Sequence, residues 1–316
     1  MNALKIFTGN SNVPLAEKIA DYLGMRLGQG RITVFPDSEV LVKVEEDVRG
    51  CDVFVIQSLC NPVNYHLMEL LIFIDCLRRA SAQRITAVLP YFGYARQDRK
   101  DEGRVPITGK LVANLIVTAG ADRVLTIDLH AAQVQGFFDI PVDHLLAEPV
   151  ISFFLKKLDL SNDLILVSPD VGNVKRAKIY AHRFNTDLAI IDKRRTSGTD
   201  IVVENIIGNV KDKTVLMVDD LISTGGTVCN AAKLCMEKGA KSVCVAATHP
   251  VLAGPAIERL KAAPIERLIV TDTIPLASAA REELKNIHVL TVSDLLGEAI
   301  RRIHRNESVS SLFITG

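Results

Sequence analysis

The strongest chemical signal in this sequence is a short run at residues 215–227, VLMVDDLISTGGT, in which an apolar strand leads into two acids and a small turn. Asp219 and Asp220 come at the predicted strand's carboxyl end, where an open α/β sheet binds its ligand, and can accept hydrogen bonds from vicinal ribose hydroxyls. The turn that follows offers hydroxyls and backbone N–H groups at a helix start, which suits a phosphate dianion. Its members are Thr224, Gly225, Gly226 and Thr227. The run predicts a seat for a phosphorylated sugar; the alternative is an ordinary strand-to-helix turn with an acidic N-cap.

Two further sets of polar residues that could bind a metal or a substrate follow predicted strands. Asp128 and His130 stand two residues apart at a strand end, so both face the same ligand-binding edge. His130 is either a metal or phosphate contact or a structural histidine. Asp170, in the run SPDVG, is suited to hold Mg²⁺ or a substrate hydroxyl, and a turn closed by its own side chain is the alternative.

A basic run, Lys193-Arg-Arg195, directly follows another predicted strand and precedes the polar stretch TSGTD. This composition is typical of a mobile loop. Charge runs are often only solvated. In a protein with a phosphate seat, however, the run predicts a lid whose cations neutralise charge in the transition state.

Two segments have the composition of a nucleotide site. The run PYFGYARQDR at residues 90–99 combines aromatic rings with two arginines, which can stack on or clamp a nucleotide. The run Phe35-Pro-Asp-Ser-Glu39 offers an aromatic face and two acceptors, as an adenine site needs. Alone it is a weak signal, because an aromatic residue beside a proline turn is common.

Composition excludes several classes of protein. Lysine plus arginine and aspartate plus glutamate both number 37, so no net field favours nucleic acid or an anionic membrane. The six cysteines form no Cys-x-x-Cys pair, which indicates reduced thiols in a cytoplasmic protein. We expect no signal peptide and no membrane span.

The 316 residues suit about two domains. Apolar strands alternate with amphipathic helices, which predicts an α/β fold with parallel sheets covered on both faces. Both halves carry a strand ending in acids, which indicates a duplicated domain with a boundary near residues 145–149. Predicted strands span residues 52–57, 84–89, 124–128, 164–168, 188–192, 215–219, 242–247 and 267–271. Predicted helices include residues 65–80, 107–119, 174–183 and 227–238.

Together these motifs resemble the ribose-phosphate diphosphokinase family, also called phosphoribosyl-pyrophosphate (PRPP) synthetases. The resemblance runs from end to end, including the closing helix at residues 296–303 and the tail at 307–313. It implies two phosphoribosyltransferase-like (type I) domains, at 1–146 and 147–296, with the tail 297–316 returning to the first. It also implies transfer of a diphosphoryl group from Mg-ATP to ribose 5-phosphate, giving PRPP and AMP. The implied assembly is a hexamer built from dimers, in which the adenine loop of one subunit reaches a neighbour's site.

The resemblance also assigns roles to individual residues. ATP is expected at Phe35, Asp37, Glu39, Arg96, Gln97, Asp98 and Arg99. Ribose 5-phosphate is expected at Asp219, Asp220, Ser223, Thr224, Gly225, Gly226 and Thr227. Mg²⁺ is expected at His130 and Asp170, and the catalytic set is Lys193, Arg195 and His130.

Some positions depart from the family pattern. Ser38 and Asn173 stand where glycine is usual. Asp47 stands where many relatives have a serine of a regulatory anion site, so phosphate activation and ADP inhibition are in doubt. The other expected members of that site are Arg49, Ser308 and Ser310. A phosphoribosyltransferase or a non-catalytic regulatory homologue are the alternative functions; the Lys-Arg-Arg run argues against the first, and the intact acid pair, His130 and loop cations against the second.

Overall fold

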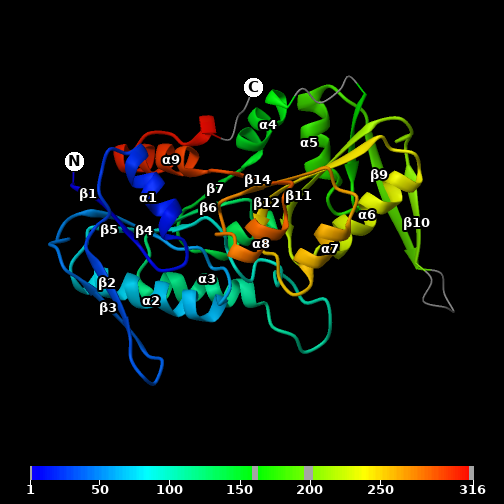
Figure 1. The fold of residues 1–316 in the computed structure, drawn as a ribbon. Helices are drawn as coiled ribbons and strands as arrows, with labels where there is room; N and C mark the ends of the chain where they lie inside the picture. The colour runs from blue at the N-terminus through cyan, green and yellow to red at the C-terminus, as the bar shows by residue number, and fades with distance from the viewer. Residues whose placement is uncertain (1, 159–162, 196–201, 313–316) are drawn as a thin grey trace. The chain divides into compact units, whose positions relative to one another are not determined.

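A computed structural model describes residues 2–158, 163–195 and 202–312, with the side chains at 193–195 and 202–204 outside that description. The α/β fold is confirmed, since helices flank two mainly parallel sheets (Figure 1). The chain divides into two compact units. Unit 1 comprises Met1–Ala147, Thr273–Pro275 and Thr291–Gly316, and unit 2 comprises Glu148–Asp272 and Leu276–Leu290. No helix in the described residues is long and apolar enough to cross a membrane.

Unit 1 is built on a five-stranded sheet in the order β1-β4-β5-β6-β7, with every pairing parallel. A separate antiparallel hairpin, β2–β3, extends from it. The strands are β1 (Leu4–Thr8), β2 (Gly30–Val34), β3 (Val40–Val44), β4 (Asp52–Ile56), β5 (Arg84–Leu89), β6 (Arg123–Ile127) and β7 (Val142–Leu145). The helices are α1 (Val13–Tyr22), α2 (Val63–Arg79), α3 (Thr108–Ala119), α9 (Ser293–Arg305) and the short η1 (Ala132–Phe137) and η2 (Ser310–Leu312).

Unit 2 is built on a seven-stranded sheet in the order β10-β9-β8-β11-β12-β13-β14. Only the pairing of β9 with β10 is antiparallel among its described strands. The strands are β8 (Leu164–Ser168), β9 (Leu188–Arg195), β10 (Val202–Ile207), β11 (Thr214–Ile222), β12 (Ser242–Pro250), β13 (Arg267–Thr271) and β14 (Ile287–Leu290). The helices are α4 (Glu148–Lys157), α5 (Val174–Phe184), α6 (Gly226–Glu237), α7 (Ala256–Ala262) and α8 (Ser278–Glu283).

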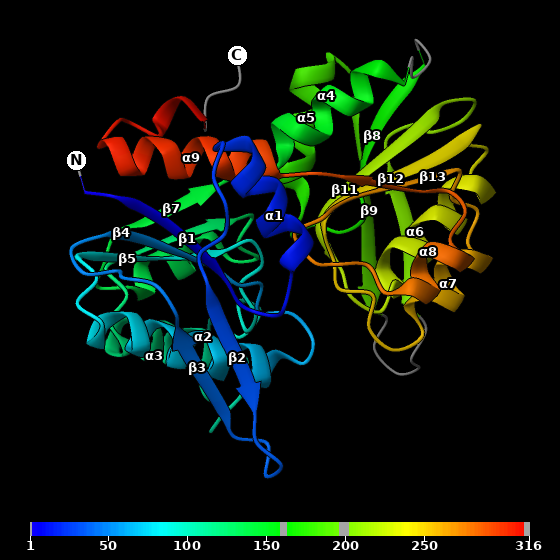
Figure 2. The ribbon, with the colours of Figure 1, turned by 60° about the vertical axis from the view of Figure 1, so that its left-hand side comes forward.

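The pattern of burial explains these layers. Every residue of β4, DVFVI, is buried, as a strand covered by helices on both faces requires. Helix α9 is strongly amphipathic and buries Leu296, Ile300 and Ile303 while its charged residues lie on the other side. It packs beside α1, so the last helix of the chain lies against the first (Figure 2).

Three strands, β9, β11 and β12, run further than their apolar residues predict. Strand β12 continues to Pro250, so the prediction that it ends at residue 247 is wrong. Strand β9 continues to Arg195, so the backbone of the basic run lies within the strand and the prediction that the strand ends at residue 192 is wrong. Its ladder with β10 supplies the hydrogen bonds that keep this charged segment extended. Strand β11 likewise continues to Ile222, because its pairing with β12 extends past Asp219.

Candidate active site

Asp219 and Asp220 lie near the carboxyl end of strand β11, just before the turn at residues 223–227. Asp220 is buried, Asp219 is partly exposed, and the Asp220 N–H donates to Asp219 Oδ1 at 2.8 Å. Burial, with the neighbouring charge of Asp220, raises the pKa of Asp219 to about 8, and the positive charge of Arg176 opposes that rise. The pair is therefore an acceptor site whose full ionisation is costly without a ligand.

The small turn leads directly into helix α6. Gly225 adopts φ +74 at the N-cap, a left-handed conformation that glycine accepts without cost, and Gly226 is the first helical residue. Thr224 and Thr227 are exposed. Hydroxyls and N–H groups thus gather at the positive end of a helix dipole, as the sequence predicted for a phosphate seat.

Asp170 lies in a turn that is tied to the same strand. Its Oδ1 accepts the Asn173 N–H at 2.9 Å, and the Asn173 side-chain amide donates to Val218 O at 2.5 Å, next to Asp219. The self-closing turn weighed as the alternative is therefore present, and it holds Asp170 near the acid pair. Asn173 has φ −92, so it needs none of the left-handed tolerance expected at a glycine position.

The turn that carries His130 follows strand β6. Asp128 takes φ +41, which turns the chain, and His130 is exposed. Three hydrogen bonds fasten this turn to the end of strand β7. They run from Asp128 N to Leu145 O at 2.9 Å, from Leu129 N to His144 Nε2 at 2.9 Å and from Ala147 N to Asp128 Oδ2 at 3.0 Å.

The expected nucleotide segment is anchored on helix α3; Phe92 is buried against Phe138, so it is not available to stack on a nucleotide, and the exposed part begins at Arg96. Gln97 accepts the Thr108 hydroxyl at 2.5 Å through its side chain and the Gly109 N–H at 3.0 Å through its carbonyl. Asp98 accepts a hydrogen bond from Gln133, three residues after His130, so the structure brings this segment to the His130 turn. Arg96 and Arg99 are exposed; Arg99 donates to Asp101, whose contact raises the pKa of the guanidinium.

The expected adenine residues lie at the tip of hairpin β2–β3. Phe35, Asp37 and Glu39 are all exposed, and Glu39 N–H donates to Asp37 Oδ1 at 3.2 Å. Ser38 takes φ +75, the conformation for which a glycine is usual. The tip is therefore a solvent-exposed loop of unit 1.

His130 belongs to unit 1 and Asp170 to unit 2. In the described part of the chain no three His, Cys, Asp or Glu side chains gather as a metal cluster. Mg²⁺ is usually held by one or two carboxylates together with water and substrate phosphates. Asp170 supplies a suitable hard oxygen, whereas an imidazole is a less typical magnesium ligand.

The remaining expected residues are placed as follows. The side chains of Lys193 and Arg195 lie outside the described part of the chain. Asp47 Oδ1 accepts the Arg49 N–H at 3.0 Å, and the Arg49 guanidinium donates to Ser81 at 3.2 Å. Ser310 N–H donates to the Ser308 hydroxyl at 3.2 Å, in the turn after α9. The Arg49 N–H is therefore already bonded to the Asp47 carboxylate.

Sequence reasoning missed two arginines near the seat. Arg176 acts on Asp219, and it follows the Asp170 turn closely enough that the pair Lys175-Arg176 was a usable signal. Arg259, in helix α7, donates to Thr224 O at 3.1 Å. No local pattern marks Arg259, because it stands far along the chain from the turn that it contacts.

Comparison with known proteins gives consistent matches. Residues 4–120 match the N-terminal domain of ribose phosphate pyrophosphokinase, and residues 203–314 match the phosphoribosyl synthetase-associated domain. Ribose-phosphate pyrophosphokinase of Rhodopirellula baltica is 56% identical over 315 residues, 99% of each chain. That of Caldanaerobacter subterraneus subsp. tengcongensis is 54% identical over 312 residues, 99% of this chain and 98% of its own. The crystal structure of phosphoribosylpyrophosphate synthetase from Mycobacterium smegmatis is 42% identical, with a TM-score of 0.91, covering 96% of this chain and 100% of that one.

Proposed function

The chain belongs to the ribose-phosphate pyrophosphokinase family, and from this membership we propose its reaction. The C1 hydroxyl oxygen of ribose 5-phosphate bonds to the β-phosphorus of Mg-ATP, the bond from that phosphorus to the α,β-bridging oxygen breaks, and the hydroxyl proton is released. The products are PRPP and AMP. The observation that carries the proposal is the acid pair Asp219-Asp220 leading into the Ser223–Thr227 turn at the start of α6.

The seat orients the sugar. Asp219 and Asp220 accept hydrogen bonds from the ribose hydroxyls while the turn holds the 5-phosphate, so two ends of the substrate are fixed and C1 is presented. Little covalent chemistry is asked of the protein in phosphoryl transfer, and positioning with charge stabilisation supplies most of the rate. Lys193 and Arg195 are the cations assigned to the charge that develops on the transferring group.

The nucleotide and metal roles extend this proposal. Phe35, Asp37 and Glu39 are assigned to adenine, and the four residues Arg96–Arg99 to the rest of the nucleotide. His130 and Asp170 would hold Mg²⁺ together with phosphate oxygens. When bound, the ion neutralises and orients those oxygens. The hydrogen bond from Gln133 to Asp98 supports a shared site for the nucleotide segment and the His130 turn.

Product analysis tests the function. The purified protein is mixed with Mg-ATP and ribose 5-phosphate, and AMP and PRPP are followed together, with and without inorganic phosphate. Equimolar AMP and PRPP are expected. A weak response to phosphate is expected as well, because Asp47 places a carboxylate where an anion would bind Arg49 N–H.

The same assay separates the alternatives. A phosphoribosyltransferase would consume PRPP with a nucleobase and would form no AMP from ATP. A regulatory homologue would bind both substrates without forming either product. No sequence or structural observation favours either one.

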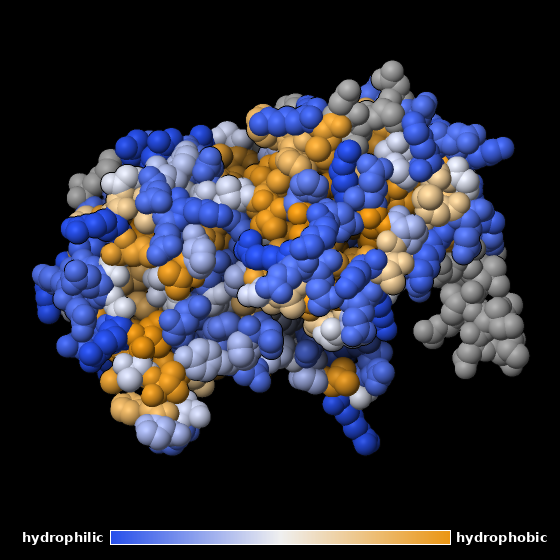
Figure 3. All heavy atoms as spheres, viewed as in Figure 1, coloured by the Kyte–Doolittle hydropathy of each residue, from blue (hydrophilic) through white to orange (hydrophobic). Residues whose placement is uncertain are grey.

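We also assign the chain to a homo-oligomer, a hexamer built from dimers, in the cytoplasm. Figure 3 shows orange and pale groups at the end of hairpin β2–β3, where Val34, Phe35 and Leu41 are each more than 40% exposed. Met68 on α2 and Leu111 on α3 are exposed further. The six cysteines are free thiols, as a reducing compartment requires. Light scattering coupled to gel filtration would give the number of subunits.

A further inference from the structure

The phosphate turn is supported from behind by a segment that no motif marks, residues 252–259, here called the brace. It connects strand β12 to helix α7 and includes the first residues of that helix. Three consecutive carbonyl oxygens, that of Ile222 at the end of β11 and those of Ser223 and Thr224 in the turn, each accept a hydrogen bond from the brace. The pairs are Leu252 N to Ile222 O at 3.0 Å, Ala253 N to Ser223 O at 3.0 Å and Arg259 Nη1 to Thr224 O at 3.1 Å.

This arrangement sets the polarity of the turn. In a trans peptide unit, the carbonyl of one residue and the N–H of the next point in opposite directions. Since the carbonyls of residues 222–224 point to the brace, the N–H groups of residues 223–225 point to the opposite side. A phosphate dianion on that side meets donors, and the carbonyl oxygens that would repel it are held away.

One residue of the brace has a strained backbone conformation. Leu252 adopts φ +45, a left-handed conformation that is costly for a bulky residue and persists only where the surroundings impose it. Its N–H is the group that bonds Ile222 O. The strained residue is therefore one of those that hold the turn.

Arg259 differs from the other two donors because it acts through a charged side chain. A β-carbon at Gly226 would lie 3.5 Å from Arg259 Nη1, so the guanidinium lies against the first residue of α6. Its charge also opposes the rise that burial causes in the pKa of Cys229, in the same helical turn. The guanidinium thus adds positive charge where the helix dipole already favours an anion.

We propose that Arg259 is a positioning residue for ribose 5-phosphate: it holds the Thr224 carbonyl away from the 5-phosphate and adds a positive charge behind the turn. This role rests on the proposed function, because it assumes that the turn holds the sugar phosphate. It predicts that replacing Arg259 changes the apparent affinity for ribose 5-phosphate and leaves the apparent affinity for Mg-ATP unchanged.

The test compares Arg259→Ala, Arg259→Gln and Arg259→Lys in steady-state assays of PRPP formation. Arg259→Ala should raise the KM for ribose 5-phosphate about 10- to 100-fold, the effect of one charged hydrogen bond, and leave the KM for Mg-ATP within about twofold. Gln, which keeps a donor, and Lys, which keeps the charge, should each recover part of the loss. Lys261→Gln is the matched control, since Lys261 lies on the same helix and pairs with Glu283 at 3.2 Å; it should behave like the parent.

A KM for ribose 5-phosphate within about twofold of the parent in all three variants would overturn the proposal, as would an equal rise in both KM values. If Arg259→Ala does not fold, as judged by thermal melting, the Gln and Lys variants decide between these outcomes. Calorimetric binding of ribose 5-phosphate provides a second measurement that needs no turnover. If the parent binds the sugar phosphate but forms no PRPP, the proposed function fails, and weaker binding by the variants would still support the brace.

Discussion

Asp219 is held in surroundings that disfavour its charge, and this has a consequence for stability. The folded protein binds the Asp219 proton more tightly than the unfolded chain does, because burial and Asp220 raise its pKa from 3.8 to about 8. The stability contributed by this residue is therefore complete below its ordinary pKa and is lost as the pH rises through the folded value. Without ligands, the protein should lose stability across that range.

Replacing Asp219 by asparagine should abolish this loss. We expect Asp219→Asn to melt at the parent's temperature at about pH 4 and roughly 2–4 °C above it at about pH 8. Circular dichroism suits the measurement, since the chain has no tryptophan. A variant less stable than the parent at the higher pH would show that the fold does not raise the pKa of Asp219.

Lys193 is expected to act in the transition state more than in binding. Lys193→Ala should lower turnover about 100-fold or more while the KM for ribose 5-phosphate changes only a few fold. Arg194→Ala is the control, because Arg194 is the one residue of the basic run to which no catalytic role is assigned. Equal losses in turnover and affinity would contradict the lid assignment, and equal losses in both variants would contradict a specific role for Lys193.

Single residues were predictable from sequence where chemistry is local. The types and spacing of the acid pair and of the turn that follows it are enough to predict a sugar-phosphate site from the sequence alone. Arg259 could not, because its contact with Thr224 depends on how a distant helix packs. Asn173 shows the same limit, since its bond to Val218 O replaces the left-handed turn that its position implied.

At the scale of elements, the turn after strand β6 is fixed by its neighbour β7. His144 Nε2 accepts the Leu129 N–H at 2.9 Å, and Leu129 is buried. His144→Ala leaves that N–H without its acceptor, which should cost about 1–2 kcal/mol. Since His130 is the next residue, turnover should fall more than the KM for either substrate changes.

The comparison needs a histidine of similar burial away from the turn. His288, on strand β14, packs against Phe154 and is a suitable control. Thermal melting and steady-state kinetics of the two alanine variants would be measured side by side. Unchanged turnover in His144→Ala, with the expected loss of stability, would limit His144 to a structural role.

The elements themselves were predicted where apolar runs are complete. Strands β5, β8 and β13 have the predicted bounds, because each is a short segment of mostly apolar residues that is buried after its first position. Strand β9 was predicted too short, since its last residues are charged and only the ladder with β10 keeps them extended. The hydrophobic pattern of a sequence predicts which residues are buried. It does not predict which charged residues are held in a strand by backbone hydrogen bonds to a neighbouring strand.

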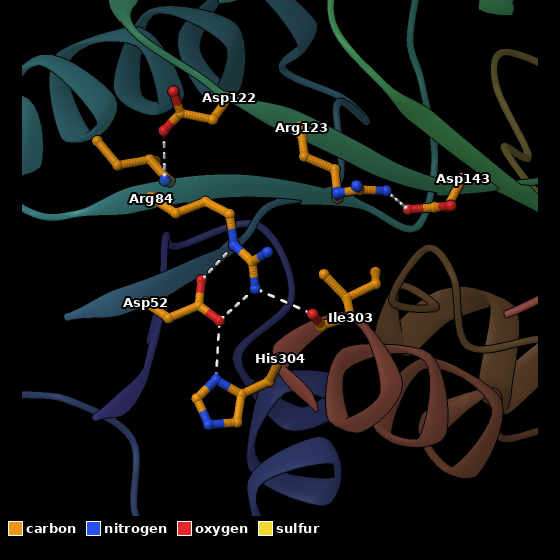
Figure 4. A network of polar contacts seen from close by, with 8 residues as sticks. Asp52, Arg84, Asp122, Arg123, Asp143, Ile303 and His304 are labelled. Carbon is orange, nitrogen blue, oxygen red and sulfur yellow. Dashed lines mark hydrogen bonds and ion pairs between the residues drawn. The ribbon is translucent and has the colours of Figure 1, made fainter. Parts of the chain in front are cut away.

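At the scale of the whole chain, unit 1 is assembled from both ends of the sequence. A polar cluster joins α9 to the sheet (Figure 4). Arg84 donates to both oxygens of Asp52, at 2.8 and 2.5 Å, and to Ile303 O at 3.0 Å, while His304 Nδ1 lies 2.8 Å from Asp52 Oδ2. The Asp52 side chain is only 5% exposed, so this carboxylate is the centre of the cluster.

Removing that carboxylate should weaken the attachment of the final helix. Asp52→Asn keeps the shape but removes the counter-charge that is hydrogen-bonded to Arg84, whose side chain is 27% exposed. Breaking a fully buried pair costs about 3–5 kcal/mol, and the partial exposure of Arg84 lowers our expectation to roughly 1–3 kcal/mol. The control is Asp75→Asn, which breaks the exposed i,i+4 pair with Arg79 and should change stability by less than about 0.5 kcal/mol. Urea unfolding monitored by circular dichroism would measure both; similar values for the two variants would mean that the helix is held by its apolar face alone.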